Sequence, residues 1–188
     1  MQFSLFGAEA ATPSLDDLDG VLLAGGRWAR TGENARLSVV VADPWRAAAL
    51  ADAFDALTVG DTEPVLDAPL GTSVRTAFDD RLLVHAARWV RGANEAPPPG
   101  LLLTAGGLRL WAIATGRRDD TGYLLGTAEP DDAVHRSAGA QLSRLGVAAV
   151  SVAARGGPGW RVTSAKRLRR LVELLGPAPV GGETAWPT

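Results

Sequence analysis

Cysteine is absent from this chain of 188 residues, and the other side chains that commonly bind transition metals are scarce. Without cysteine the protein has no disulfide and no thiolate ligand or nucleophile. The only two histidines, His85 and His135, each fall within an expected helix, and neither has a second histidine at a metal-ligand spacing. The sequence therefore does not support zinc chemistry or nucleophilic catalysis, and we expect no metal site and no cofactor.

Long apolar runs are also missing. No uninterrupted stretch approaches the roughly 20 residues that cross a bilayer as a helix. The first residues have neither the positive charge nor the long apolar segment of a secretion signal. Together with the absence of cysteine, this pattern is typical of a cytoplasmic protein. We expect a monomer that does not bind membranes.

Positive charge is not in excess, because the formal net charge is −2 with 19 basic and 21 acidic residues. This balance argues against a protein that coats nucleic acid by bulk attraction. The basic residues are nevertheless skewed: Lys166 is the only lysine, and the rest are arginines. Arginine is the better residue for bidentate contacts with phosphate and guanine, so a few specific contacts with DNA remain open.

The first half of the chain alternates helical and extended patterns. Ser14 is a suitable N-cap for a first helix, which the glycine pair at 25–26 ends. The further elements expected in this half are strands at 27–31 and 36–41, a helix at 44–57, strands at 63–67 and 72–77, and a helix at 79–91. We assign residues 1–13 to a flexible tail, 14–92 to a first repeat, and 93–106 to a linker.

The second half repeats this order less clearly. Its expected elements are a helix at 107–115, a strand at 121–128, a helix at 129–145, strands at 147–154 and 160–163, and a helix at 164–175. A segment matches as well, since residues 42–44 (Ala-Asp-Pro) resemble 128–130 (Ala-Glu-Pro). We assign 107–176 to a second repeat and 177–188 to a loose tail. The pattern favours an internally duplicated α+β fold over an ordinary alternation of elements.

The first expected helix carries a nine-residue segment, Leu18–Gly26, that resembles the LAGLIDADG motif of homing endonucleases and related DNA-binding domains. It keeps the motif's leucine, first glycine, apolar pair, alanine and last glycine. Residues 108–116 retain only Leu108, Ala114 and Gly116. The resemblance implies two αββαββα halves with pseudo-two-fold symmetry and the two motif helices side by side. Small residues would allow that close approach: Gly20, Ala24, Ala112 and Ala114.

In the family that the chain resembles, the eighth motif residue is an acid that presents a carboxylate to a metal ion. Carboxylates suit magnesium because it prefers hard oxygen ligands. Here the eighth positions are Gly25 and Thr115, so we expect no catalytic residue and no enzyme activity. The rival reading is a residual nuclease that uses displaced carboxylates such as Asp19 or Asp120.

The resemblance also implies that the hairpin strands could form a DNA-binding saddle without the acids. Trp28 and Trp160 could stack on bases there, but we expect them in the core. The alternative for the arginines is an ordinary solvated strand face. The candidate DNA-binding residues are Arg27, Arg30, Arg36, Arg75, Arg117, Arg118, Arg155 and Arg161.

The N-terminal segment Gln2, Phe3, Ser4, Leu5, Phe6 resembles the short peptide by which bacterial replication and repair proteins dock on the sliding DNA clamp. On this resemblance Leu5 and Phe6 would fill an apolar pocket of the clamp, and the Gln2 amide would hydrogen-bond at its rim. The alternative is a terminal strand or a staple onto the core.

These patterns together predict a non-enzymatic, nucleoid-associated protein of bacterial DNA replication or repair. Its expected partners are the sliding clamp and, through an inactive LAGLIDADG-like scaffold, double-stranded DNA. Two alternatives stay open: the residual nuclease, and a DNA-binding transcription regulator in which the clamp-like peptide is accidental.

Overall fold

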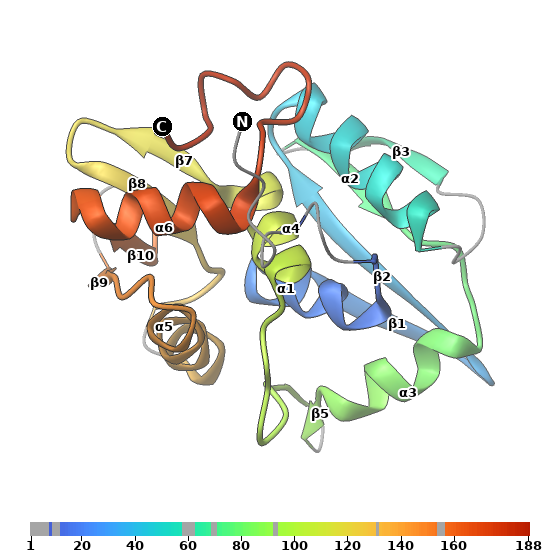
Figure 1. Ribbon diagram of the computed structural model, residues 1–188. Coiled ribbons are helices and arrows are strands. Elements are labelled where there is room, and N and C mark those ends of the chain that lie inside the picture. The colour runs from blue at the N-terminus through green and yellow to red at the C-terminus, as the bar shows by residue number, and fades with distance from the viewer. Residues whose placement is uncertain are drawn as a thin grey trace.

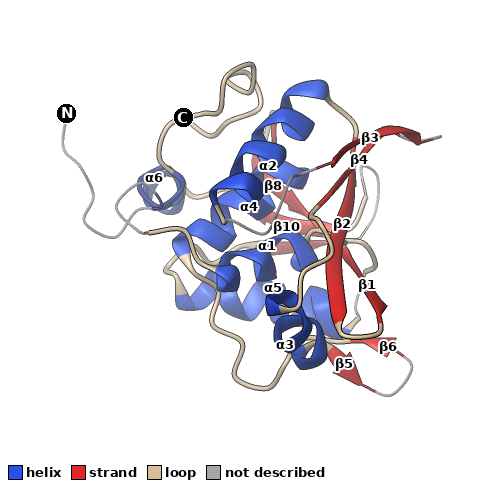
Figure 2. Ribbon diagram, turned by 90° about the vertical axis from the view of Figure 1, so that its right-hand side faces the viewer, coloured by secondary structure: helices blue, strands red, loops and turns tan. Residues whose placement is uncertain are grey.

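The computed structural model describes residues 8, 12–57, 63–68, 71–91, 94–130, 132–153 and 157–188. Two four-stranded antiparallel sheets lie on either side of a central pair of helices, α1 and α4 (Figure 1). A view from the side shows the strands of the first sheet toward one edge of the molecule and most helices toward the other (Figure 2). No helix in these ranges is both long and apolar enough to cross a membrane.

The first sheet has the strand order β1-β2-β4-β3. In β2 the side chains alternate, with Leu37 and Val39 buried and Arg36 and Ser38 partly exposed, so one face of this sheet packs on helices and the other is open. The elements of this half are α1 (Leu18–Leu23), β1 (Arg27–Thr31), β2 (Asn34–Val41), α2 (Pro44–Ala56), β3 (Glu63–Ala68), β4 (Gly71–Arg75) and α3 (Arg81–Arg88).

The second sheet has the corresponding order, β7-β8-β10-β9. A short hairpin of β5 (Val90–Arg91) and β6 (Asn94–Glu95) connects the two halves. The elements of the second half are α4 (Ala105–Thr115), β7 (Arg117–Asp119), β8 (Gly122–Gly126), α5 (Ala133–Arg144), β9 (Val150–Val152), β10 (Gly159–Val162) and α6 (Ala165–Leu175). The expected α+β class is confirmed, whereas the duplication with its pseudo-two-fold symmetry stays a prediction.

The two central helices touch through their backbones. A Cβ atom added to Gly20 of α1 would overlap the backbone of Gly107 in α4. Beside this contact the Thr104 hydroxyl donates a hydrogen bond of 2.6 Å to Asp17, which links the starts of the two helices. The predicted approach of the motif helices is confirmed, with glycine on both sides at the closest point.

Three segments differ from the expected elements. No strand was predicted at Arg117–Asp119, where β7 lies, and the β5–β6 hairpin begins inside the first repeat and ends in the predicted linker. Residues 177–188, expected to be loose, instead pack on the body: Trp186 is 4% exposed, and its indole N–H donates to the carbonyl of Gly176 at 2.9 Å. The packing of Trp186 was not predicted, because the many glycines and prolines of residues 177–188 suggest a mobile chain.

The buried apolar side chains form one continuous cluster that includes both halves. Leu22 and Leu23 enter it from α1, and Leu108 and Trp111 enter it from α4. Because the core is shared, the two sheets have fixed positions relative to the central helices. The open faces of the sheets are therefore rigid platforms for whatever side chains they present.

Candidate nucleic-acid interface

A row of polar side chains crosses the open face of the first sheet. Ser38 of β2 pairs directly with Arg27 of β1 on one side and with Arg75 of β4 on the other. Directly paired residues of antiparallel strands point to the same face of the sheet. This face is opposite to the one that buries Leu37 and Val39. Arg27, Ser38 and Arg75 thus stand side by side away from the helices.

A corresponding row crosses the second sheet. Leu124 of β8 pairs with Arg117 of β7 and with Arg161 of β10. Trp160, the neighbour of Arg161, points the other way, since its ring stacks on that of His135 in α5 with 4.9 Å between centroids. Arg117, Leu124 and Arg161 therefore also lie on the face turned away from the helices.

The two rows agree position by position, and we refer to them as the arginine rows. Arg27 and Arg117 are each the first residue of the strand that follows a central helix. Arg75 lies on β4, which pairs with β2 on the side away from β1. Arg161 lies on β10, which pairs with β8 on the side away from β7. Leu124 between the two arginines of the second sheet is only 1% exposed, so that face is more covered than the first. Corresponding guanidinium groups on the two faces turned away from the helices make a surface that suits two segments of a phosphate backbone.

Two carboxylates partly balance these cations. Glu95 lies 3.4 Å from the Arg27 guanidinium, and Asp119 lies 2.7 Å from that of Arg161. The Thr121 hydroxyl donates to Asp119 at 2.6 Å, and this bond, with the charge of Arg161, lowers the pKa of Asp119 below its ordinary value. Asp119 is thus ionised at neutral pH. Glu95 also accepts a hydrogen bond of 2.8 Å from the Trp28 backbone N–H. Ion pairs near the surface are worth on the order of 1 kcal/mol, so a phosphate can compete with each acid for its guanidinium group.

The other candidate arginines are placed differently. Arg36 shares the open face of the first sheet, and its guanidinium lies 4.5 Å from the centre of the Phe78 ring. Arg30 pairs with Ala35 and Arg118 pairs with Tyr123, so both belong to the helix-covered faces, although both are exposed at strand ends. Arg155 lies outside the described residues.

The strand register also shows which aromatic residues face the core and which face the surface. Trp28 pairs with Leu37 on the helix side, and Trp160 packs on Gly139 of α5. Both tryptophans therefore contribute to the core, as expected. Phe78 was not singled out from the sequence, yet it is 40% exposed beside Arg36. No periodic pattern surrounds Phe78, since it follows the end of β4, so little in the sequence indicated a surface role for this residue.

The ends of the central helices carry no carboxylate at the motif's eighth position. Gly25 has a φ of 100°, and a Cβ atom there would lie 3.1 Å from that of Ala128. The Thr115 hydroxyl donates to the carbonyl of Gly126 at 3.1 Å. Among the residues that the structure describes, no group of three or more histidine and acidic side chains is arranged to hold a metal ion.

A buried arginine fixes the end of α4. Arg46, the third residue of α2, is 7% exposed and donates to the carbonyls of Ile113 and Gly116 at 2.6 and 2.7 Å. Its Nε also donates to Asp43 at 2.7 Å. These carbonyls would otherwise lack partners at the helix end. Arg46 therefore positions the turn that leads from α4 into Arg117.

The two carboxylates of the nuclease alternative lie apart. Asp19 is 2% exposed and accepts a hydrogen bond of 2.7 Å from the indole of Trp89, which directly follows α3. Burial raises the pKa of Asp19, while the Trp89 bond opposes that rise. Asp120 belongs to the turn between β7 and β8, and this hairpin and α3 lie on opposite sides of the molecule (Figure 1).

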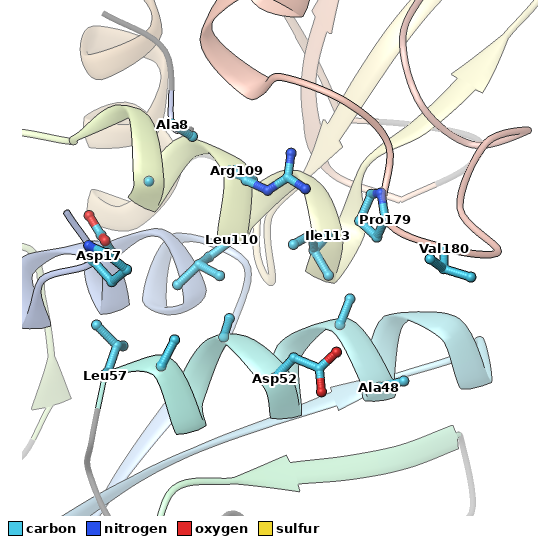
Figure 3. Close-up of a pocket in the computed structure, with 15 residues that line it drawn as sticks. Ala8, Asp17, Ala48, Asp52, Leu57, Arg109, Leu110, Ile113, Pro179 and Val180 are labelled. Atoms are coloured by element: carbon cyan, nitrogen blue, oxygen red, sulfur yellow. The ribbon is translucent and has the colours of Figure 1, made fainter. Parts of the chain in front are cut away.

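An apolar recess of about 480 Å³ lies between α2 and α4 (Figure 3). Alanines of α2 form one wall, and Leu110 and Ile113 of α4 form the other. Two of its polar side chains are engaged elsewhere: Arg109 donates to the carbonyls of Leu175 and Pro177, and Asp17 accepts from the Thr104 hydroxyl. Ala8 also lines the recess. Gln2 to Phe6 themselves lie outside the described residues.

The arrangement of helices and sheets is also found in a solved structure. The chain is similar in structure to the homing endonuclease I-WcaI bound to its DNA recognition sequence, with a TM-score of 0.64 over 96% of this chain and 91% of that one. The chain has a LAGLIDADG-like fold. Sequence identity over the match is 10%, so the likeness concerns the fold alone. No family model matches the sequence, and no curated protein matches it.

Proposed function

We propose that this LAGLIDADG-like protein binds double-stranded DNA through the arginine rows without cleaving it. The observation that carries the proposal is the correspondence of Arg27 with Arg117 and of Arg75 with Arg161 on two open sheet faces. Guanidinium groups form bidentate hydrogen bonds with phosphate oxygens. The structural neighbour is bound to its DNA recognition sequence, which supports the same use of this scaffold.

The proposal excludes phosphodiester cleavage because of the ends of the central helices. Gly25 has no side chain to offer, and the Thr115 hydroxyl is already hydrogen-bonded to Gly126. A neutral hydroxyl does not replace a carboxylate as a magnesium ligand. Magnesium-dependent nicking of duplex DNA that disappears in Asp19→Ala or Asp120→Ala would overturn this part and favour the nuclease.

The second part of the proposal is a tether to the bacterial sliding clamp, in the setting of DNA replication or repair. Leu5 and Phe6 would be the buried anchors of a linear peptide. Ala8 lies at the recess between α2 and α4, on the helix side of the molecule.

The DNA-binding test compares two double variants. Arg27→Ala with Arg161→Ala removes one cation from each row, and Arg30→Ala with Arg118→Ala removes the same charge from the helix-covered faces. Fluorescence anisotropy with a labelled duplex should show binding at low salt, and the row variant should lower the magnitude of the log–log salt slope by up to roughly 2, about 0.9 per phosphate contact. Absence of binding at low salt, or equal losses in both variants, would end the proposal.

The clamp test is calorimetry with purified clamp. A short peptide that must be ordered on binding should give a dissociation constant on the order of micromolar. Phe6→Ala should cost about 2 kcal/mol or more if that ring is a hot spot, and Gln2→Ala should cost less. Equal heats for the wild type and for Leu5→Ala with Phe6→Ala would remove the tether and leave DNA binding as a separate activity.

A further inference from the structure

The exposed side of α6 (Ala165–Leu175) carries a second cluster of cations. Its apolar side is buried through Leu171, Leu174 and Leu175. The first part of the helix leaves four basic residues wholly or partly exposed within five positions, and we call this set the α6 basic face. It consists of Lys166, Arg167, Arg169 and Arg170, which line a broad surface hollow with Gly146, Ser164 and Glu173.

This face is poorly neutralised. Arg170 lies 3.3 Å from Glu173, but no carboxylate among the described residues forms an ion pair with Lys166, Arg167 or Arg169. Residues three and four apart are neighbours on a helix, and like charges there repel. Lys166 and Arg167 also occupy the first turn, where the helix dipole disfavours cations. The arrangement therefore lowers the stability of the free protein, and a bound anion would relieve each of these repulsions.

The α6 basic face does not belong to the arginine rows. α6 packs against α4 on the helix side of the molecule. In the side view α6 lies at the opposite edge from the strands of the first sheet (Figure 2). A straight duplex held on the open sheet faces would not reach α6, so these cations require a ligand of their own.

We infer that the α6 basic face binds the phosphodiester backbone of a second nucleic-acid segment. Charge complementarity carries the inference: three arginines and a lysine offer a wide arc of donors to a repeating polyanion. A small phosphate would engage only one or two of these side chains, whereas a backbone can engage all four. The protein would then hold one segment on the sheets and another on α6, and so bridge two duplexes.

Two triple variants test this inference. Lys166→Gln with Arg167→Gln and Arg169→Gln neutralises the α6 basic face and keeps helix-forming residues. Arg30→Gln with Arg118→Gln and Arg144→Gln is the matched control, since it removes the same charge from exposed positions elsewhere. The assay measures how much of a labelled duplex the full-length protein captures on an immobilised duplex at low salt.

The wild type and the control should capture the labelled duplex, and the α6 variant should capture at least tenfold less of it. In a background of Arg27→Ala with Arg161→Ala, residual binding of a single duplex should remain, and the α6 substitutions should remove it. That background separates the two proposals, because loss of the rows alone leaves the α6 site measurable. Equal capture by the α6 variant and the control overturns the inference, as does a competition in which polyglutamate, but not duplex DNA, occupies the face.

Discussion

The two halves present the same surface chemistry but are held in place differently. Both sheets carry an arginine row at the same strand positions. Beneath them, Gly20 precedes Arg27 by seven residues, whereas Gly107 precedes Arg117 by ten. The second half therefore has about one more helical turn between the helix contact and its sheet. The arginine positions correspond although the supports differ, which favours a role for the surface over an accident of packing.

The helix that follows the first hairpin of each half, α2 or α5, shows this difference at its third residue. Arg46 and His135 both stand three positions after an aspartate N-cap, at Asp43 and Asp132. Arg46 reaches into the other half to bond the end of α4. His135 stays in its own half, where its ring nitrogens lie 2.9 Å from the Thr127 hydroxyl and 2.8 Å from that of Ser151.

The largest effect should follow from a change at the point where the halves meet. In Gly20→Ala the new methyl group would overlap the backbone of Gly107, so the central helices must separate. We expect a loss of about 4 kcal/mol or more in the free energy of unfolding, measured by urea denaturation. Gly32→Asn is the control, because Gly32 has a φ of 55° and open space around it. A small loss in Gly20→Ala would mean that the helix contact is adjustable.

The next largest effect should distinguish Arg46 from His135. Arg46→Met leaves the α4 carbonyls unpaired in a buried place, and we expect a loss of about 3 kcal/mol. His135→Phe keeps a ring against Trp160 and leaves Ser151 exposed to water, so we expect about 1 to 2 kcal/mol. Chemical denaturation of both variants checks the order. Equal losses would show that the two helices are anchored equally well.

The arginine rows should give smaller and matched effects. Arg75→Ala and Arg161→Ala stand at corresponding positions, so each should weaken duplex binding by a similar factor and lower the salt slope by about 0.9. Anisotropy titrations over a range of salt concentrations measure both quantities. A large effect from one half and none from the other would show that only one row touches DNA.

The smallest effect should be a pair of opposite pH dependences. Asp19 has a raised pKa, so the folded protein holds this proton more tightly than the unfolded chain. Ionised Asp19 therefore lowers the free energy of unfolding. The wild type recovers this loss as pH falls from the raised pKa toward 3.8. Asp119 has a lowered pKa, so its contribution is present above 3.8 and is lost as pH falls through the lowered value.

Urea unfolding as a function of pH would compare two variants with the wild type. Asp19→Asn should remove the gain in stability on acidification, and Asp119→Asn should remove the loss. If both substitutions change the pH profile in the same direction, one of the two pKa shifts has the wrong sign.

The sequence predicted those elements that local pattern decides. The alternation in residues 36–41 and the glycines at 25–26 placed β2 and the end of the first helix, and Gly20 pointed to the helix contact. β7 was missed because its three residues, two arginines and an aspartate, carry no apolar alternation. The faces of Arg30 and Arg118 depend on register, which the sequence of an edge strand does not specify.

Contacts between residues far apart in the sequence were not predicted, for a different reason. Nothing near Arg46 in the sequence indicates that its guanidinium meets carbonyls more than 60 positions later. The position of Trp186 on Gly176 likewise depends on how the last residues turn back. The basic residues of the α6 basic face were not singled out from the sequence, and their separation from the arginine rows depends on the relative placement of α6 and the sheets.

The bond network of Arg46 also bears on how the chain could be divided. A fragment that stopped in the β5–β6 hairpin would carry Arg46 without the carbonyls it bonds, and the complementary fragment would carry those carbonyls without their donor. Each piece would also expose its side of the shared core. Two fragments cut there should thus be unfolded separately and regain structure only when mixed, which makes the hairpin a suitable place for a split-protein reporter.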